Sequence, residues 1–274
     1  MTINRKKAIR AAGLFAYVLA ACLLVYLWRP TYLASIIIVL GPPAVVDWLW
    51  LKEARWRILF FAVATTSLFA PPVELMSRLA DAWDVQSVLP RPLGIMPIEN
   101  LLFAFIDFFW GLSFYEYFIG RDRRRPLSKR FPVLLGLYLG LDVLVFGLYV
   151  RNPQMVSLNY AWTGALMLII PAALIFRRRP KLLRLTVWPM VFFAAVYFVY
   201  EFVSLCIGSW WWPGEYLLPA RLCGRVFPID DVIIWYLLST PALIGGYEYF
   251  VVGDERDPGR VSAPERSGVF DGSR

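Results

Sequence analysis

The stretch MPIENLLF at residues 96–103 opens a long apolar segment that closes with YEYF at residues 115–118. The same arrangement returns as FPIDDVII at residues 227–234, which is closed by YEYF at residues 247–250. Proline and acidic side chains are favoured at the start of a helix by its free N–H groups and its dipole. The sequence therefore predicts a duplicated helix, here called the motif helix, with a polar pair at its start and a Tyr-Glu pair at its end.

The composition of the chain predicts an all-α, polytopic membrane protein. Of its 274 residues, 59% are apolar and 17% are aromatic, and the mean hydropathy is +0.58, far above the values of soluble proteins. Apolar stretches of about 20 residues predict spans at residues 8–28, 32–51, 56–76, 97–119, 131–150, 158–176, 184–208 and 226–252. We expect the first span to be retained, because no small-residue cleavage site follows it.

Basic residues indicate the orientation, because Lys and Arg are enriched in cytoplasmic loops. All but six of the 28 Lys and Arg residues fall at the termini or in the loops on the same side of the predicted membrane. The six others are Arg29, Arg78, Arg91, Arg151, Arg221 and Arg225. We expect a cell-membrane protein with both termini cytoplasmic and a disordered tail at residues 254–274. The net charge of +8 then reflects topology and the lipid bilayer, not a nucleic-acid partner.

The repeat extends beyond the motif helices and predicts two parallel units of four spans, at residues 1–120 and 121–253. Glu74 and Glu201 stand at matching places, each nine residues before a tryptophan, Trp83 or Trp210. Units of four spans begin on the same side of the membrane, so the halves are expected to meet around a pseudo-twofold axis along its normal.

Acidic residues form two predicted layers. Glu116 and Glu248 lie roughly 25 Å along their helices from the polar pairs, where an anchoring role at the interface is the alternative to a site. The outer layer supplies the candidate catalytic residues Glu74, Glu99, Glu201, Asp230 and Asp231. Candidate substrate-binding residues are Phe103, Asn100, Trp83, Trp210 and Trp211.

Hydrocarbon favours the neutral form of a carboxylic acid, and neighbouring acids resist joint ionisation. We therefore expect at least one outer carboxyl to carry a proton at neutral pH. A protonated acid among aromatic faces is suited to protonating an alkene and stabilising the resulting cation. Asp47, Asp107 and Asp142 have no counterpart in the other half, and each is either functional or paired within the protein.

These motifs resemble those of the integral-membrane lycopene cyclases, in units of about residues 31–119 and 158–250. The resemblance implies cyclisation of a linear carotene end group by protonation, ring closure and proton loss, with no net redox change. Its partners would be lycopene or a longer homologue and other carotenoid-pathway enzymes. The Pro-x-Glu-Glu pattern of that family falls on Pro97-Ile98-Glu99-Asn100 and Pro228-Ile229-Asp230-Asp231, so one acid is replaced by an amide and two others are shortened.

Two other functions remain open. Asn100 and the shortened acids are also compatible with an inactive relative that binds carotenoid or serves as a partner subunit. Parallel repeats with acids near the axis also occur in proton-coupled transporters. No cofactor or metal is expected, because the chain lacks a dinucleotide-binding glycine motif and a metal-binding acid cluster. We expect Cys22, Cys206 and Cys223 to pack in the interior without forming a disulfide.

Overall fold

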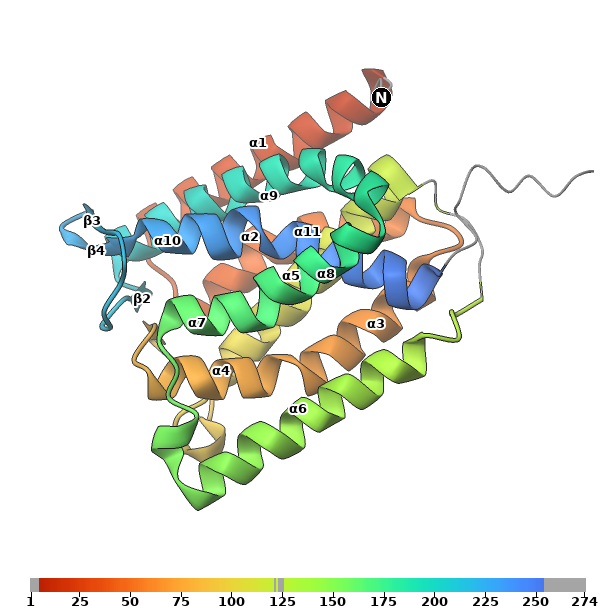
Figure 1. The fold of residues 1–274 in the computed structure, drawn as a ribbon. Helices are drawn as coiled ribbons and strands as arrows, with labels where there is room; N and C mark the ends of the chain where they lie inside the picture. Colours follow the sequence, from red (N-terminus) through yellow and green to blue (C-terminus); the bar gives the residue numbers. More distant parts are fainter. Residues whose placement is uncertain (1–4, 121, 123–125, 254–274) are drawn as a thin grey trace, which may run out of the picture.

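The computed structural model of the chain describes residues 5–120, 122 and 126–253. The predicted disordered tail at 254–274 lies outside these residues. Within the described part, eight helical segments are long and apolar enough to cross a membrane, as the sequence predicted. They run side by side in one bundle, with α6 diverging along one edge (Figure 1).

The spans follow one another in the predicted order. They are α1 (Arg5–Trp28), α2 (Tyr32–Trp50), α3 with α4 (Arg55–Leu68, Ala70–Leu79), α5 with the π-helical turn η2 (Ile98–Tyr115, Glu116–Gly120), α6 (Phe131–Arg151), α7 with η4 and α8 (Tyr160–Gly164, Ala165–Ile169, Ile170–Arg178), α9 (Pro180–Ile207), and α10 with η5, α11 and η6 (Ile229–Asp231, Val232–Leu237, Ser239–Gly246, Tyr247–Val252). Short 3-10 turns, η1 (Pro92–Gly94) and η3 (Pro153–Met155), lie in the connections. The helical part of the last span begins at Ile229, not at 226, because the preceding residues form a strand.

The first motif helix, α5 with η2, packs against α2 and α3. The second motif helix, α10 through η6, packs against α8 and α9, and its α11 segment also contacts α5. The first helix of each half packs on the other half: α1 contacts α9, and α6 contacts α3 and α4. The two motif helices thus meet in the interior of the bundle, and the halves interleave around them.

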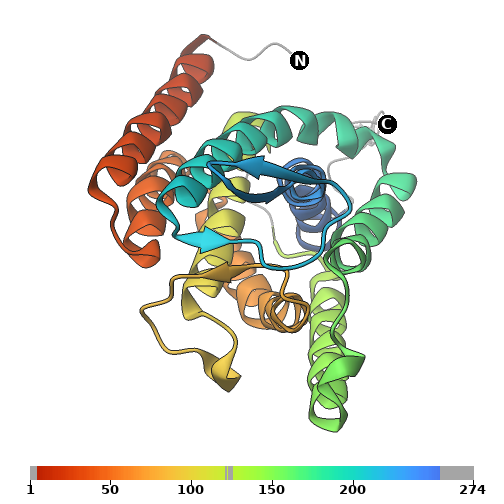
Figure 2. The same cartoon turned by 90° about the vertical axis from the view of Figure 1, so that its left-hand side faces the viewer.

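Two loops form a cap at one end of the bundle, in which β1 (Asp84–Val85) pairs with β2 (Trp210–Trp211). The second loop continues into a hairpin of β3 (Pro219–Leu222) and β4 (Arg225–Pro228), which leads directly into α10. Figure 2 shows these strands lying across the end of the helices. We call residues 80–97 and 208–228 the cap; β1 and β2 join its two loops.

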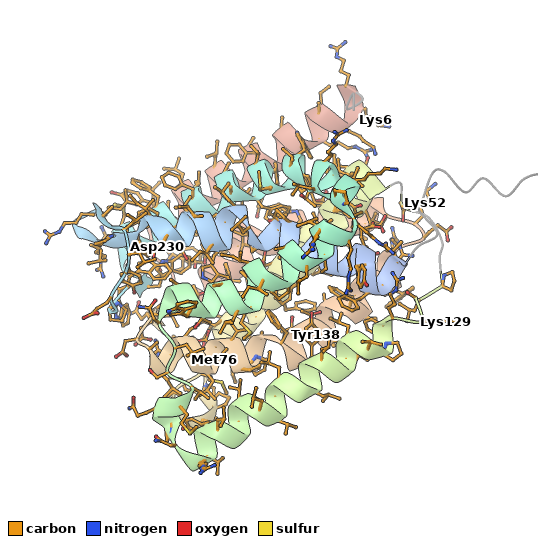
Figure 3. The ribbon with its side chains drawn as sticks, viewed as in Figure 1. Lys6, Lys52, Met76, Lys129, Tyr138 and Asp230 are labelled. Carbon is orange, nitrogen blue, oxygen red and sulfur yellow. A yellow bond between two sulfur atoms is a disulfide. The ribbon has the colours of Figure 1, made fainter. Side chains whose placement is uncertain are left out.

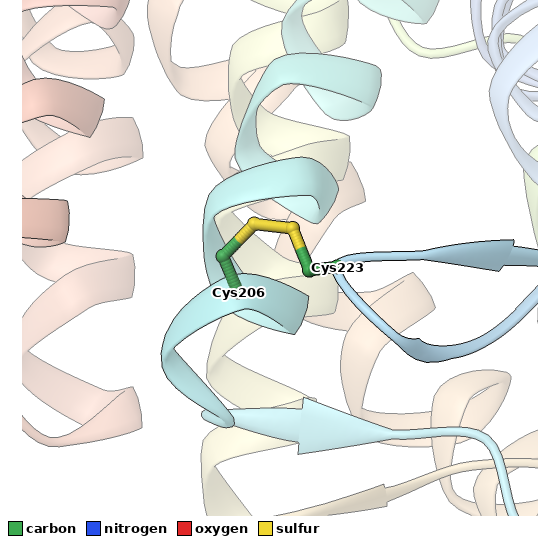
Figure 4. Close-up of a disulfide and its surroundings, with 2 residues drawn as sticks. All are labelled: Cys206 and Cys223. Carbon is green, nitrogen blue, oxygen red and sulfur yellow. A yellow bond between two sulfur atoms is a disulfide. The ribbon is translucent and has the colours of Figure 1, made fainter.

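Cys206 and Cys223 form a disulfide, with Cα atoms 5.1 Å apart (Figure 4), so the prediction that no cysteines pair was wrong. Gly208 ends α9 in a left-handed conformation that turns the chain into the cap. Cys223 and Gly224 form the tip of the β3–β4 hairpin, with φ of 51° and 76°, and positive φ at both tip residues suits the right-handed twist of the strands. The disulfide ties this tip back to α9.

The two ends of the bundle differ in the charged side chains that they carry. Figure 3 shows Lys6, Lys52 and Lys129 at the end opposite Asp230 and the cap. At this basic end, the Asp122 carboxylate accepts the backbone N–H groups of Lys52, Glu53 and Ala54. The connection between α2 and α3 is thereby held against the residues that follow η2.

Candidate active site

A largely apolar cavity of about 190 Å³ lies between the two motif helices, beneath the cap. Its lining includes side chains from both halves of the chain, among them Glu74, Asn100, Glu201 and Asp231. Four of the six polar outer-layer positions singled out in the sequence are therefore brought together. The other two, Glu99 and Asp230, do not line it.

Glu74 lies in the middle of α4, and its side chain joins the first motif helix to the cap. The side-chain amide of Asn100 donates to Glu74 Oε1 at 2.7 Å. The indole N–H of Trp83 donates to Glu74 Oε2 at 3.3 Å. Glu74 is 5% exposed, so both carboxyl oxygens are engaged at the wall of the cavity and not in solvent.

Glu201 has the corresponding place in the second half, and three donors surround it. The indole N–H groups of Trp210 and Trp212 donate to Oε1 at 2.8 Å and 2.7 Å. The hydroxyl of Tyr236, from the second motif helix, donates to Oε2 at 2.8 Å. The spacing of nine residues between glutamate and tryptophan, noticed twice in the sequence, therefore marks a hydrogen bond in each half.

The first acid of each polar pair binds backbone in the cap. Glu99 accepts N–H groups of Val88 and Leu89, both at 2.7 Å, and the hydroxyl of Ser87 at 2.8 Å. Asp230 accepts the N–H groups of Leu217 and Leu218 more weakly, at 3.4 Å each. A carboxylate in the first turn of a helix also interacts favourably with the helix dipole. The geometry of Glu99 and Asp230 suits them to holding the cap over the cavity.

The second residue of each pair faces the cavity instead. Asp231 is 3% exposed and lines the cavity together with Glu74 and Asn100. Because consecutive residues of a helix point about 100° apart, one member of the pair reaches the cap while the other reaches the cavity. Asn100 is thus an amide at the place where the second half has a carboxyl.

Aromatic rings form most of the remaining wall. Phe103 stacks on Tyr200, with ring centroids 6.3 Å apart, and meets Trp210 edge-on at 6.4 Å. Trp83 meets Trp212 edge-on at 6.2 Å, so the two halves of the cap also touch through their tryptophans. Several π faces are thereby available to a cation formed inside the cavity.

Trp211 does not line the cavity, whereas Trp210 and Trp212 do. The reason is the extended backbone of this segment, in which successive side chains point to opposite faces. In an extended Trp-Trp-Trp run, the first and third side chains lie on one face, and this alternation could have predicted that Trp210 and Trp212 share the cavity wall. Tyr216 also joins the cap loops, because its hydroxyl donates to the carbonyl of Ala82. Burial, and secondarily Asp231, raises the pKa of Tyr216 and keeps this donor protonated.

Sequence reasoning did not assign Asp107, Tyr197 or Tyr236 to the site, although all three line the cavity. Asp107 lies seven residues beyond Asn100, and this spacing returns to the same face of a helix. The hydroxyl of Tyr197 donates to Asp107 Oδ1. Helical periodicity from Asn100 through Phe103 to Asp107 could have identified this face.

The cavity combines carboxyl groups, indole and phenol donors, and apolar space for a hydrocarbon. It can exclude water from a reacting group and can hold a proton donor beside an alkene. Comparison of the chain with protein-family models, with curated protein sequences and with solved structures finds no significant match.

Proposed function

We propose that the protein is a carotenoid end-group cyclase, acting on lycopene or a longer linear homologue. The observation that carries the proposal is the convergence of Glu74, Glu201 and Asp231 on one apolar, aromatic-walled cavity. A protonated carboxyl transfers its proton to the terminal alkene, a neighbouring alkene closes the ring, and a ring proton is lost. The substrate and the cyclic product are isomers, so the reaction needs neither an oxidant nor a reductant.

The dimensions of the cavity suit one end of a long lipid. At about 190 Å³ it is smaller than the roughly 300–1,000 Å³ of pockets that enclose drug-sized ligands. One end group would occupy the cavity while the remaining polyene extends between helices into the bilayer. Two-ended substrates would then be processed one end at a time.

Within this proposal, Glu74, Glu201 and Asp231 are the candidate proton donors. Glu99 and Asp230 act through the cap, because their hydrogen bonds go to cap backbone and hold it over the cavity. Phe103, Trp83, Trp210 and Trp212 supply the faces that stabilise positive charge. Asn100 orients Glu74 through its amide.

The arrangement of contacts supports a parallel duplication. Each opening helix packs on the third span of the other half, α1 on α9 and α6 on α3 and α4. This exchange is expected of two similar units related by a twofold axis along the membrane normal. The cavity then lies at the interface between the units.

We further propose a cell-membrane location with the basic end of the bundle, and both termini, in the cytoplasm. The cap would then face an oxidising compartment. The Cys206–Cys223 disulfide in the cap supports this orientation, because disulfides persist outside the reducing cytoplasm.

Expression in a bacterial strain that accumulates lycopene, followed by HPLC of the extracted pigments, tests the proposed function. The wild type is expected to convert lycopene to cyclic carotenes, and Glu74→Gln, Glu201→Gln and Asp231→Asn are expected to reduce this conversion. Glu53→Gln, an exposed acid at the basic end, is the matched control and should convert normally. Protein levels in the membrane fraction are measured for every variant.

Unchanged lycopene beside a normal amount of membrane-inserted wild type would contradict lycopene cyclisation. Pigment that copurifies with the protein without being converted would favour the inactive carotenoid-binding relative. Asn100 is the observation that favours this alternative. It occupies the position equivalent to Asp231, and an amide cannot donate a catalytic proton.

A further inference from the structure

Asp107 carries the further inference, which rests on the proposed cyclisation. It lies on the first motif helix in the middle of its span, and it lines the cavity. No candidate proton donor shares its position, because Glu201 and Asp231 lie near the cap-side ends of their helices and Glu74 is hydrogen-bonded to Asn100 in the first turn of α5. The cavity therefore has carboxyl groups at two depths.

The separation between these depths fits one end group. Asn100, which contacts Glu74 directly, precedes Asp107 by seven residues, a rise of roughly 10 Å along the helix. Phe103 and Ala104 lie between them and also line the cavity. A folded hydrocarbon end group placed against Phe103 would have the candidate proton donors at one side and Asp107 at the other.

The hydrogen bonding of Asp107 differs from that of Glu201. Three side-chain donors engage Glu201, whereas in the described part of the chain the side-chain donor to Asp107 is the Tyr197 hydroxyl. A carboxylate has about four acceptor positions on its two oxygens. Asp107 consequently retains acceptor capacity on the side that lines the cavity.

The two halves also differ at this depth. When the two motif helices are aligned on their polar pairs, Leu238 in the second half is the equivalent of Asp107 in the first. The same alignment sets Asn100 against Asp231. Near the cap, the first motif helix thus lines the cavity with an amide and the second with an acid, whereas deeper in the span only the first has an acid, Asp107. This difference assigns different tasks to the two helices.

We propose that Asp107 is the base that removes the ring proton after cyclisation, with Tyr197 as its positioning residue. One of the candidate proton donors, Glu74, Glu201 or Asp231, gives its proton to the terminal alkene, whose π electrons form the new C–H bond and leave a tertiary cation. The π electrons of the neighbouring alkene form the ring C–C bond and move the cation onto the ring.

Asp107 then takes a proton from a carbon next to that cation, and the electrons of the broken C–H bond form the ring alkene. One proton enters the substrate and one leaves it. Exchange with water reprotonates the donor and deprotonates Asp107. Which neighbouring carbon loses its proton decides the position of the ring double bond, so the base also determines the ring type.

In the test, purified protein in lipid vesicles is supplied with lycopene in D₂O. The ratio of ring double-bond isomers in the product is then compared between the wild type and Asp107→Asn. Asp47→Asn is the matched control, since Asp47 is also a span acid, accepts from Trp110 Nε1 at 2.8 Å and does not line the cavity. Loss of a general base typically costs about 100-fold or more. We expect a loss of this order for Asp107→Asn, with an altered isomer ratio in the residual product and with deuterium still incorporated.

Tyr197→Phe keeps the carboxyl and removes its donor, so it tests the position of the base if Asp107→Asn folds poorly. We expect a smaller loss, about tenfold, and an isomer ratio altered in the same direction. A wild-type isomer ratio in both variants would overturn the assignment. So would complete loss of cyclic product in folded Asp107→Asn together with an unaltered isomer ratio in Tyr197→Phe, a result that would fit Asp107 as the donor. Absence of cyclic product in the wild type itself would instead contradict the proposed function.

Discussion

The hydroxyl of Tyr115 donates to Glu248 Oε1 at 2.8 Å, and the relationship is reciprocal. Tyr247, the counterpart of Tyr115 in the second YEYF motif, donates to Glu116 Oε1 at 3.0 Å. Each tyrosine therefore binds the glutamate of the other copy, at the basic end of the bundle. Arg57 completes the group through an ion pair with Glu116 at 2.9 Å, and all five residues are at most 8% exposed. This group fastens the ends of the two motif helices together.

Replacing Arg57 by Ala should destabilise the protein severely. Removal of one partner of a buried ion pair leaves an uncompensated charge and costs about 3–5 kcal/mol. The temperature at which the protein loses its monodisperse peak in detergent should fall accordingly. Arg91→Ala is the control, because the Arg91–Asp84 pair is more exposed and such pairs contribute about 0–1 kcal/mol. Equal melting temperatures for the two variants would contradict the role of Arg57.

Trp212→Phe should lower activity, whereas Trp211→Phe should not. The first change removes an indole donor to Glu201 and leaves a buried acceptor short of a partner, at a cost of about 1–3 kcal/mol. We expect cyclic carotene formation to fall by about tenfold, since 1.4 kcal/mol corresponds to that factor. Trp211 lies on the other face of its strand, so its variant serves as the control. HPLC at matched protein level would contradict the account if both variants behaved alike.

Replacement of Glu99 should mainly affect stability, whereas replacement of Asp231 should mainly affect activity. Glu99→Gln replaces an acceptor of two backbone N–H groups and should cost about 1–3 kcal/mol of stability, with activity retained by the folded fraction. Asp231→Asn should retain stability and lose activity. Melting temperature and product per folded protein are measured together for both variants. A stable, inactive Glu99→Gln protein would return Glu99 to the list of proton donors.

Reduction of the Cys206–Cys223 disulfide should loosen the cap. The bond closes a loop with a sequence separation of 17, for which chain-entropy estimates give about 3 kcal/mol. Dithiothreitol should therefore lower the melting temperature of the wild type and of Cys22→Ala, whose remaining cysteines can still pair. The double variant Cys206→Ser/Cys223→Ser should melt low with or without dithiothreitol. A wild type unaffected by dithiothreitol under conditions that reduce the bond would contradict a stabilising role.

Hydrophobic patterning and the repeated motif predict much of this architecture, because a bilayer requires long apolar helices. They predict the number of spans and the grouping of Glu74, Glu201 and Asp231. Short strands have no comparable sequence period that reveals their register. The sequence therefore predicted Trp211 in the cavity wall where the structure has Trp212, and it did not predict the hairpin before Ile229. The disulfide was missed because Cys206 and Cys223 show no familiar spacing, although both fall at the end of the bundle predicted to lie outside the cytoplasm.

The different roles of neighbouring polar residues could not be predicted from the sequence. Glu99 and Asn100 are adjacent, yet one binds the cap backbone and the other binds Glu74. That division depends on where the cap loops pass, which is a tertiary property. Asp107 was noticed only as an acid without a counterpart, because its relation to the cavity depends on how the two motif helices pack.

The central claim, that a carboxyl group in the cavity protonates a carotene end group, is tested most directly by isotope uptake. Purified protein in lipid vesicles is supplied with lycopene in D₂O, and the product is examined by mass spectrometry. The account predicts a cyclic product that carries one deuterium for every ring formed, and less of this product from Asp231→Asn, Glu74→Gln or Glu201→Gln than from the wild type. A cyclic product without deuterium, or full activity of Asp231→Asn together with Glu74→Gln and Glu201→Gln, would contradict it.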